Sequence, residues 1–115
     1  MQSFGHAWAG LKVLLRQEHN SRVHAVATLG AVIAGYFGGI ARLEWALLVI
    51  VIGMVWIAEL TNTAVERLAD AITVETHPLI GIAKDVAAAA VLIASGVAVI
   101  VGAIVFVPVL GRWIG

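Results

Sequence analysis

Three long apolar stretches dominate the chain and predict three helices that cross a membrane. They cover about residues 23–41, 45–68 and 82–110, and the third has no charged residue from Val86 to Gly111. At about 1.5 Å per residue, such a stretch can cross, with some tilt, a hydrocarbon core about 30 Å thick. The first stretch is rich in glycine and alanine, which predicts close helix packing. The expected fold class is therefore an all-α membrane protein.

The segment before the first apolar stretch has the spacing of an amphipathic helix. Within about residues 4–19, Phe4, Trp8, Leu11 and Leu15 recur at intervals of three to four residues among polar and basic positions. This pattern is typical of a helix that lies along the membrane surface. Because no apolar core of a leader follows a basic N-terminus here, we expect no cleavable signal peptide.

The composition agrees with a membrane protein. Of the 115 residues, 62% are hydrophobic and 12% are charged, against about 25% charged residues in soluble domains. The net charge of zero gives no general attraction to nucleic acid. Cysteine is absent, which excludes disulfides and thiolate metal sites and leaves oxygen and imidazole ligands. A chain of this length predicts one domain over residues 1–115.

The basic residues predict how the chain is oriented in the membrane. Two of them, Arg42 and Arg112, fall on one side, and five fall on the other: Lys12, Arg16, Arg22, Arg67 and Lys84. Basic loop residues favour the cytoplasm. We therefore expect a cytoplasmic N-terminus and a C-terminus outside.

Two carboxylates interrupt the second apolar stretch. At about 100° per residue, Glu59, Asn62, Glu66 and Asp70 lie on one helical arc about 80° wide. A charge near the bilayer centre costs about 2.5 to 3.5 kcal/mol on insertion scales, so intramembrane carboxylates are usually functional. Glu59 and Glu66 are about 10 Å apart along the axis, too far to bind one Mg²⁺ together at about 2.1 Å. The arc predicts a site in which the two carboxylates have separate roles.

A second polar cluster lies between the second and third apolar stretches. Pro78 suits the first turn of a helix, and Lys84 and Asp85 follow just before the long uncharged run. A lysine in this position can contact phosphate oxygens as a compact positive charge. It could also simply extend to the membrane surface. The neighbouring Asp85 weakens that simpler explanation.

Three sequence blocks resemble the small bacterial integral-membrane lipid kinases, the family of diacylglycerol kinase and undecaprenol kinase. The blocks are E-x-x-N-x-x-x-E-x-x-x-D in residues 59–70, A-K-D-x-A-A-x-A-V-L in residues 83–92, and W-x-G-L with E-x-N-x-R-x-H in residues 8–24. The resemblance covers nearly the whole chain. It implies a homotrimer of three-span subunits in the bacterial inner membrane, with active sites shared between neighbouring subunits on the cytoplasmic side.

The resemblance also implies a reaction and roles for individual residues. ATP would donate its γ-phosphate to the hydroxyl of a membrane lipid, with Mg²⁺ as the cofactor. Glu59 would be the general base, and Glu18 and Glu66 would bind Mg²⁺. The family's ATP contacts correspond here to His6, Glu18, Asn62, Glu66, Asp70, Glu75, Thr76, His77, Lys84 and Asp85. The corresponding lipid contacts are Trp8, Arg22, His24, Glu59 and Ala88.

Two details of the resemblance favour undecaprenol over diacylglycerol as the lipid. The enterobacterial diacylglycerol kinases tend to carry an acidic residue in place of His24 and a serine in place of Ala88. His6 occupies a position that is often tyrosine in the family, so nucleotide contacts at this position stay open.

Other functions stay open on the sequence alone. A small proton-coupled transporter could use Glu59 to bind a proton and a cationic substrate in turn, and a subunit without turnover could use the arc as a polar seam between helices. Trp8, Arg22 and His24 could serve only as headgroup anchors, and Glu18 could be an ordinary surface residue. Neither the phosphate-binding loop of soluble nucleotide enzymes nor the protein-kinase signatures occur in the sequence, so a nucleotide would be held by helix faces.

Overall fold

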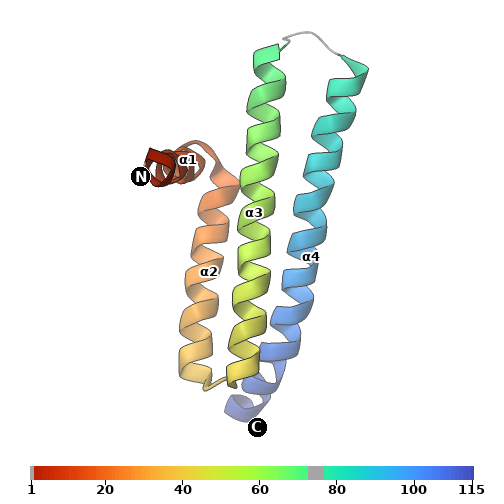
Figure 1. Ribbon diagram of the computed structural model, residues 1–115. Helices are drawn as coiled ribbons and strands as arrows, with labels where there is room; N and C mark the ends of the chain where they lie inside the picture. The colour runs from red at the N-terminus through yellow and green to blue at the C-terminus, as the bar shows by residue number, and fades with distance from the viewer. Residues whose placement is uncertain (1, 73–76) are drawn as a thin grey trace.

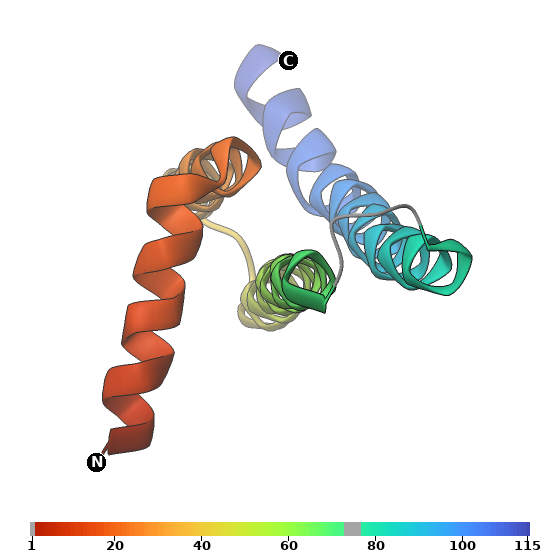
Figure 2. The ribbon, with the colours of Figure 1, turned by 90° about the horizontal axis from the view of Figure 1, so that it is seen from above.

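The structure, a computed structural model that describes residues 2–72 and 77–115, consists of four helices in this part of the chain. They are α1 (Gln2–Gln17), α2 (His19–Gly38), α3 (Arg42–Ile72) and α4 (Pro78–Ile114). Figure 1 shows α2, α3 and α4 running alongside one another, and α1 turned sharply away at the start of α2. Seen from above in Figure 2, α1 extends outward from the three long helices. The all-α prediction is confirmed.

The helices differ from the predicted segments mainly at their ends. Both α3 and α4 extend beyond the apolar stretches, because helical hydrogen bonding continues into polar residues that hydropathy does not mark. Glu18 alone separates α1 from α2, since its backbone is extended, with φ −109° and ψ 115°. The first stretch was expected to reach residue 41, whereas α2 ends at Gly38 because Gly39 adopts the left-handed conformation with φ 62°.

Two of the helices have the length and hydropathy needed to cross a membrane. In α3 and α4, the best 18-residue windows have mean hydropathies of 2.1 and 2.8, and only 28% and 11% of them are buried within the chain. So much exposed apolar surface requires lipid or another apolar partner. Among the described helices, α2 does not contain an 18-residue window of comparable hydropathy. It begins with the polar residues 19–22.

The helices pack most tightly at the end where α2 turns into α3. A Cβ atom added to Gly35 would lie 2.8 Å from the side chain of Trp45, and one added to Gly38 would lie 2.8 Å from that of Val109. Any larger residue would therefore force these neighbouring side chains, or the helices that carry them, to shift. The predicted close packing is confirmed at these two glycines. A buried apolar cluster fills the same end of the bundle and consists of Ile40, Leu48 and Val105.

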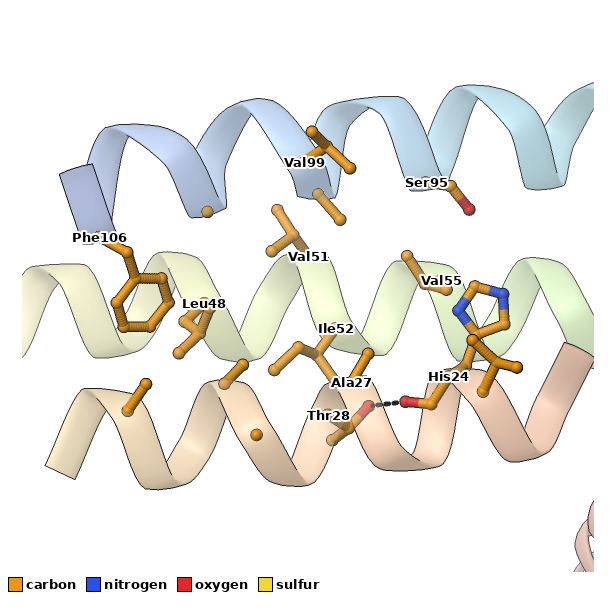
Figure 3. A pocket seen from close by; sticks show the side chains of 16 residues that line it. His24, Ala27, Thr28, Leu48, Val51, Ile52, Val55, Ser95, Val99 and Phe106 are labelled. Carbon is orange, nitrogen blue, oxygen red and sulfur yellow. Dashed lines mark hydrogen bonds between the residues drawn. The ribbon is translucent and has the colours of Figure 1, made fainter. Parts of the chain in front are cut away.

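Beyond this end, an apolar groove lies between α2, residues 48–55 of α3 and residues 95–106 of α4. Its volume is about 570 Å³, and it runs from His24 at one end to Phe106 at the other (Figure 3). Besides His24, its only polar side chains are Thr28 and Ser95 among the lining residues described. Gly30 lines this groove, and a Cβ added to it would meet no atom within 4 Å. The glycines of α2 thus have two different surroundings. Gly35 and Gly38 lie in tight contact with side chains of α3 and α4, whereas Gly30 lines the open groove.

Candidate active site

The predicted polar arc lies on one face of α3 and becomes more exposed toward the C-terminal end of the helix. Glu59 is buried, Asn62 and Glu66 are half-buried, and Asp70 is exposed. No glycine or proline interrupts α3 between Gly53 and its end at Ile72. The continuous helix that the arc required is therefore confirmed. It carries polar groups from the buried middle of the bundle to its surface.

The most buried carboxylate of the arc contacts a histidine of the neighbouring helix. His24 Nε2 lies 2.9 Å from Glu59 Oε1, so the imidazole N–H of α2 donates to the carboxylate of α3. Both residues were predicted to contact the lipid substrate, and the structure brings them together. Within residues 2–72 and 77–115, no hydrogen bond reaches the other carboxylate oxygen, Glu59 Oε2. One oxygen is thus engaged, and the second can accept a proton.

A second polar contact joins α2 and α3 one helical turn away. The indole Nε1 of Trp56 donates to Thr28 Oγ1 over 3.0 Å. The Thr28 hydroxyl in turn donates to the backbone carbonyl of His24 over 2.7 Å, the bond drawn as a dashed line in Figure 3. Sequence analysis did not identify Thr28 or Trp56. Their spacing would have pointed to them, because they lie four residues after His24 and three before Glu59, on the same helix faces.

Two ion pairs lie at the more exposed end of the site. Arg67 donates to Glu18 over 2.8 Å, and Lys84 Nζ donates to Asp70 over 2.8 Å. The first pair brings the carboxylate of Glu18 from the α1–α2 corner to the turn of α3 that also carries Glu66. Lys84 is likewise brought to the exposed end of the arc. Arg67 is a residue that sequence analysis used only for orientation, and no motif indicated its contact with Glu18.

The groups around Glu66 suit a hard cation. Asn62 Nδ2 lies 3.4 Å from Glu66 Oε1, and the Asn62 Oδ1 atom is buried without a hydrogen-bond partner in the described part of the chain. Such an unpaired acceptor costs about 1 to 3 kcal/mol. Three or more acidic or histidine side chains do not meet as a metal cluster among the described residues. Mg²⁺ usually takes one or two carboxylates together with substrate phosphates, so Glu18 and Glu66 are the carboxylates here that would hold it.

His77 caps the N-terminus of α4, a role that the sequence did not indicate. It precedes α4, and its Nδ1 accepts a hydrogen bond from the backbone N–H of Leu79 over 3.2 Å. The proline after it lies in the first turn of the helix, as expected. The other two predicted nucleotide contacts of this segment, Glu75 and Thr76, lie outside the described residues.

The remaining predicted site residues are exposed and lie outside these contacts. In the described ranges, the side chains of His6, Arg22 and Asp85 make no hydrogen bond or ion pair with another residue. Trp8 is exposed on α1, with Lys12 Nζ 5.8 Å from the centroid of its ring. Ala88 is exposed on α4. One chain therefore gathers the arc, Glu18, His24 and Lys84, and leaves these five residues at its surface.

The chain matches a known protein family over most of its length. The description "prokaryotic diacylglycerol kinase" applies to the family that matches residues 5–106 of the chain. The chain belongs to this family. The membership confirms the prediction of a lipid kinase and gives no support to the transporter alternative.

Individual relatives cover most of the chain. An undecaprenol kinase of Bacillus subtilis (strain 168) is 38% identical over 107 residues, which are 93% of this chain and 87% of that protein. A diacylglycerol kinase of Escherichia coli (strain K12) is 38% identical over 100 residues, which are 87% of this chain and 82% of that protein. A diacylglycerol kinase of Synechocystis sp. is 37% identical over 107 residues, 92% of this chain but 61% of that longer protein. These relatives thus include a kinase named for each of the two candidate lipids.

Proposed function

We propose that this lipid kinase transfers the γ-phosphate of ATP to the hydroxyl of undecaprenol, with diacylglycerol as the alternative lipid. The observation that carries the proposal is the contact of His24 with the buried Glu59. His24 lies at one end of the apolar groove (Figure 3). A long-chain alcohol can place its hydrocarbon tail along such a groove and its hydroxyl at the polar end. A general base must lie within hydrogen-bond reach of the proton it removes.

The general base in this proposal is Glu59. Its Oε2 atom accepts the proton of the lipid hydroxyl while the hydroxyl oxygen forms a bond to the γ-phosphorus of ATP. The bond from that phosphorus to the bridging oxygen breaks, and ADP leaves with the bridging oxygen's electron pair. His24 holds Oε1 over 2.9 Å and so keeps the carboxylate oriented during the transfer. Asn62 Oδ1, which is buried without a partner among the described residues, can accept a hydrogen bond from a reactant.

The nucleotide is held at the more exposed end of the arc. Glu18 and Glu66 would hold Mg²⁺ with ATP, and the cation would neutralise charge on the phosphates. Arg67 must release Glu18 for this, and Lys84 must exchange Asp70 for a phosphate oxygen. Both pairs are exposed enough for such exchange. The other proposed nucleotide contacts are His6, Asn62, Asp70, Glu75, Thr76, His77 and Asp85.

The proposed membrane arrangement has α2, α3 and α4 as spans and α1 along the cytoplasmic surface of the inner membrane. The exposed apolar surfaces of α3 and α4 support it, and so does the outward direction of α1 (Figure 2). Trp8, Arg22 and Ala88 would contact the lipid from the surface of the chain. The same exposed faces can pack against other copies, which supports the homotrimer with shared sites implied by the family.

We favour undecaprenol as the lipid because the groove that ends at His24 is almost entirely apolar. An isoprenoid alcohol has one hydroxyl on a long hydrocarbon chain, whereas diacylglycerol adds ester oxygens that need polar partners. The groove offers few such partners besides His24, Thr28 and Ser95 among its described lining residues.

The test is phosphorylation by the purified protein, given Mg²⁺, ATP labelled at the γ-phosphate, and each lipid separately. We expect label on undecaprenol with a higher kcat/KM than on diacylglycerol. Efficient labelling of diacylglycerol alone would reverse the choice of lipid and keep the reaction. Transfer to neither lipid would contradict the proposed function. A parallel measurement of proton flux in vesicles should show no transport.

A further inference from the structure

Two residues without a role in the proposed chemistry tie α2 to α3 beside the general base. Trp56 Nε1 donates to Thr28 Oγ1 over 3.0 Å, one turn from the contact of His24 with Glu59. We propose that Trp56 and Thr28 are positioning residues that hold His24 against Glu59. The proposal rests on the proposed function, because it assigns these residues to the alignment of the base in that reaction.

The chemistry of the hydroxyl fixes the direction of this contact. The hydroxyl of Thr28 has one hydrogen, and it donates that hydrogen to the backbone carbonyl of His24 over 2.7 Å. The lone pairs of the oxygen remain as acceptors. An indole N–H can only donate, so Trp56 must be the donor and the Thr28 oxygen the acceptor. The contact therefore links Trp56 to the backbone of the histidine that holds the base.

The position of the contact matters because little else holds α2 to α3 at this depth. The tight packing lies at Gly35 and Gly38, near the opposite end of α2, and the apolar groove separates the helices between. In lipid, apolar side chains gain nothing by leaving a hydrocarbon solvent, so close packing and polar contacts determine the distance between helices. The bond from Trp56 to Thr28 thus limits how far α2 can move from Glu59. A displacement of about 1 Å in a reacting group can cost about a hundredfold in rate.

The activity test compares the removal of each polar group with a matched control. Trp56→Phe removes the indole N–H, and Thr28→Val removes the hydroxyl with little change in shape. The control Thr61→Val removes a hydroxyl with the same type of intrahelical bond, to Ile57 O over 2.8 Å, but with no partner on another described helix. The control Trp113→Phe removes an exposed indole far from the site.

We expect each of the two variants to lower kcat for lipid phosphorylation by about three- to fifteenfold. The KM for ATP should stay unchanged, because the nucleotide end of the arc is not altered. Thr28→Ser, which keeps the hydroxyl, should restore kcat. The double variant should be no worse than either single one, because both remove the same bond. Equal losses in the controls, or unchanged kcat in both variants of an active enzyme, would overturn the inference.

A background without the imidazole separates positioning from a general structural role. In His24→Ala protein, Trp56→Phe should cause no further loss of kcat, since the contact acts through His24. An equal loss in that background would overturn the inference and assign Trp56 to overall stability. If the wild-type protein phosphorylates neither lipid, the proposed function itself fails. Normal wild-type activity with unaffected variants refutes only the positioning role.

A spectroscopic measurement tests the contact independently of turnover. In protein labelled with ¹⁵N-tryptophan, the indole resonance missing from Trp56→Phe assigns Trp56. We expect the Trp56 indole proton to shift upfield in Thr28→Val, because it loses its acceptor, and to stay in place in Thr61→Val. An unchanged resonance in Thr28→Val would show that the bond is absent and would overturn the inference.

Discussion

Three pairs of charged or ionisable side chains in this protein have nearly the same lengths in two very different surroundings. The deep pair of His24 and Glu59 is 2.9 Å long, with side chains 25% and 8% exposed. The rim pairs, Arg67 with Glu18 and Lys84 with Asp70, are both 2.8 Å long, with side chains between 31% and 67% exposed. Distance alone therefore does not separate them. Access to water does, because water and salt compete for exposed charges and not for buried ones.

This difference assigns different tasks to the two regions. The deep pair joins α2 to α3 next to a second cross-helix bond, so its geometry is restrained by the backbone of both helices. The rim pairs use long arginine and lysine side chains that can change partner at little cost. A fixed geometry suits proton removal. Exchangeable charges suit the arrival and departure of a nucleotide.

The largest effect is expected from the deep region. Glu59→Gln should lower kcat by about 10²- to 10⁴-fold, because an amide cannot accept the proton of the lipid hydroxyl. The affinity for Mg²⁺ and ATP should change little, since the nucleotide is held at the rim. Steady-state phosphorylation with labelled ATP and a nucleotide-binding measurement check the two parts.

The matched control for this variant is Glu44→Gln at the opposite end of α3. Glu44 Oε1 accepts from the backbone N–H of Ala41 over 2.8 Å, and an amide oxygen can accept in the same way. We expect nearly normal turnover. Activity retained in Glu59→Gln would refute its role as the base and remove the distinction drawn between the two regions.

A smaller loss of activity, which added Mg²⁺ should reverse, is expected when Glu66 is changed. Glu66→Gln should raise the Mg²⁺ concentration needed for half-maximal activity on the order of tenfold, because a neutral amide oxygen binds the cation less strongly than a carboxylate. A titration of Mg²⁺ at fixed ATP measures this, and high Mg²⁺ should recover much of kcat. A loss that no Mg²⁺ concentration restores would place Glu66 in the chemical step with Glu59.

The smallest effect is expected at Arg67. Arg67→Gln removes an exposed ion pair, so the stability should change by less than about 1 kcal/mol. Because Glu18 loses its competing partner, half-maximal activity should need slightly less Mg²⁺. Thermal unfolding and the same titration, each at low and high salt, test this, with Arg42→Gln as the control for lost charge. A loss as large as that of Glu66→Gln would mean that Arg67 itself contacts the nucleotide.

The periodicity of the sequence was sufficient to predict the arc on α3. Glu59, Asn62, Glu66 and Asp70 share a face because they belong to one helix, and their order of burial follows from their order along it. The same reasoning placed a helix before the first apolar stretch and tight packing at the glycines of α2. Such features depend on residues close in sequence.

The contacts between helices could not be predicted in the same way. The bonds of Thr28 with Trp56 and of Glu18 with Arg67 join residues 28 and 49 positions apart. They depend on the rotation of two helices about their axes and on the bend between α1 and α2, which a pattern within one helix does not define. The spacing of residues along one helix limits the candidate contact residues to one face of that helix. The partner across the interface becomes known only with the packing.

The bend between the first two helices has a mechanical consequence. It consists of a single residue, Glu18, whose extended backbone joins α1 to α2 and whose carboxylate reaches α3. If that carboxylate exchanges arginine for a cation, as proposed, its ion pair no longer ties the start of α2 to α3. Hydrogen exchange at the backbone amides on both sides of Glu18, with and without nucleotide, would then report whether this joint loosens when the ion pair is lost.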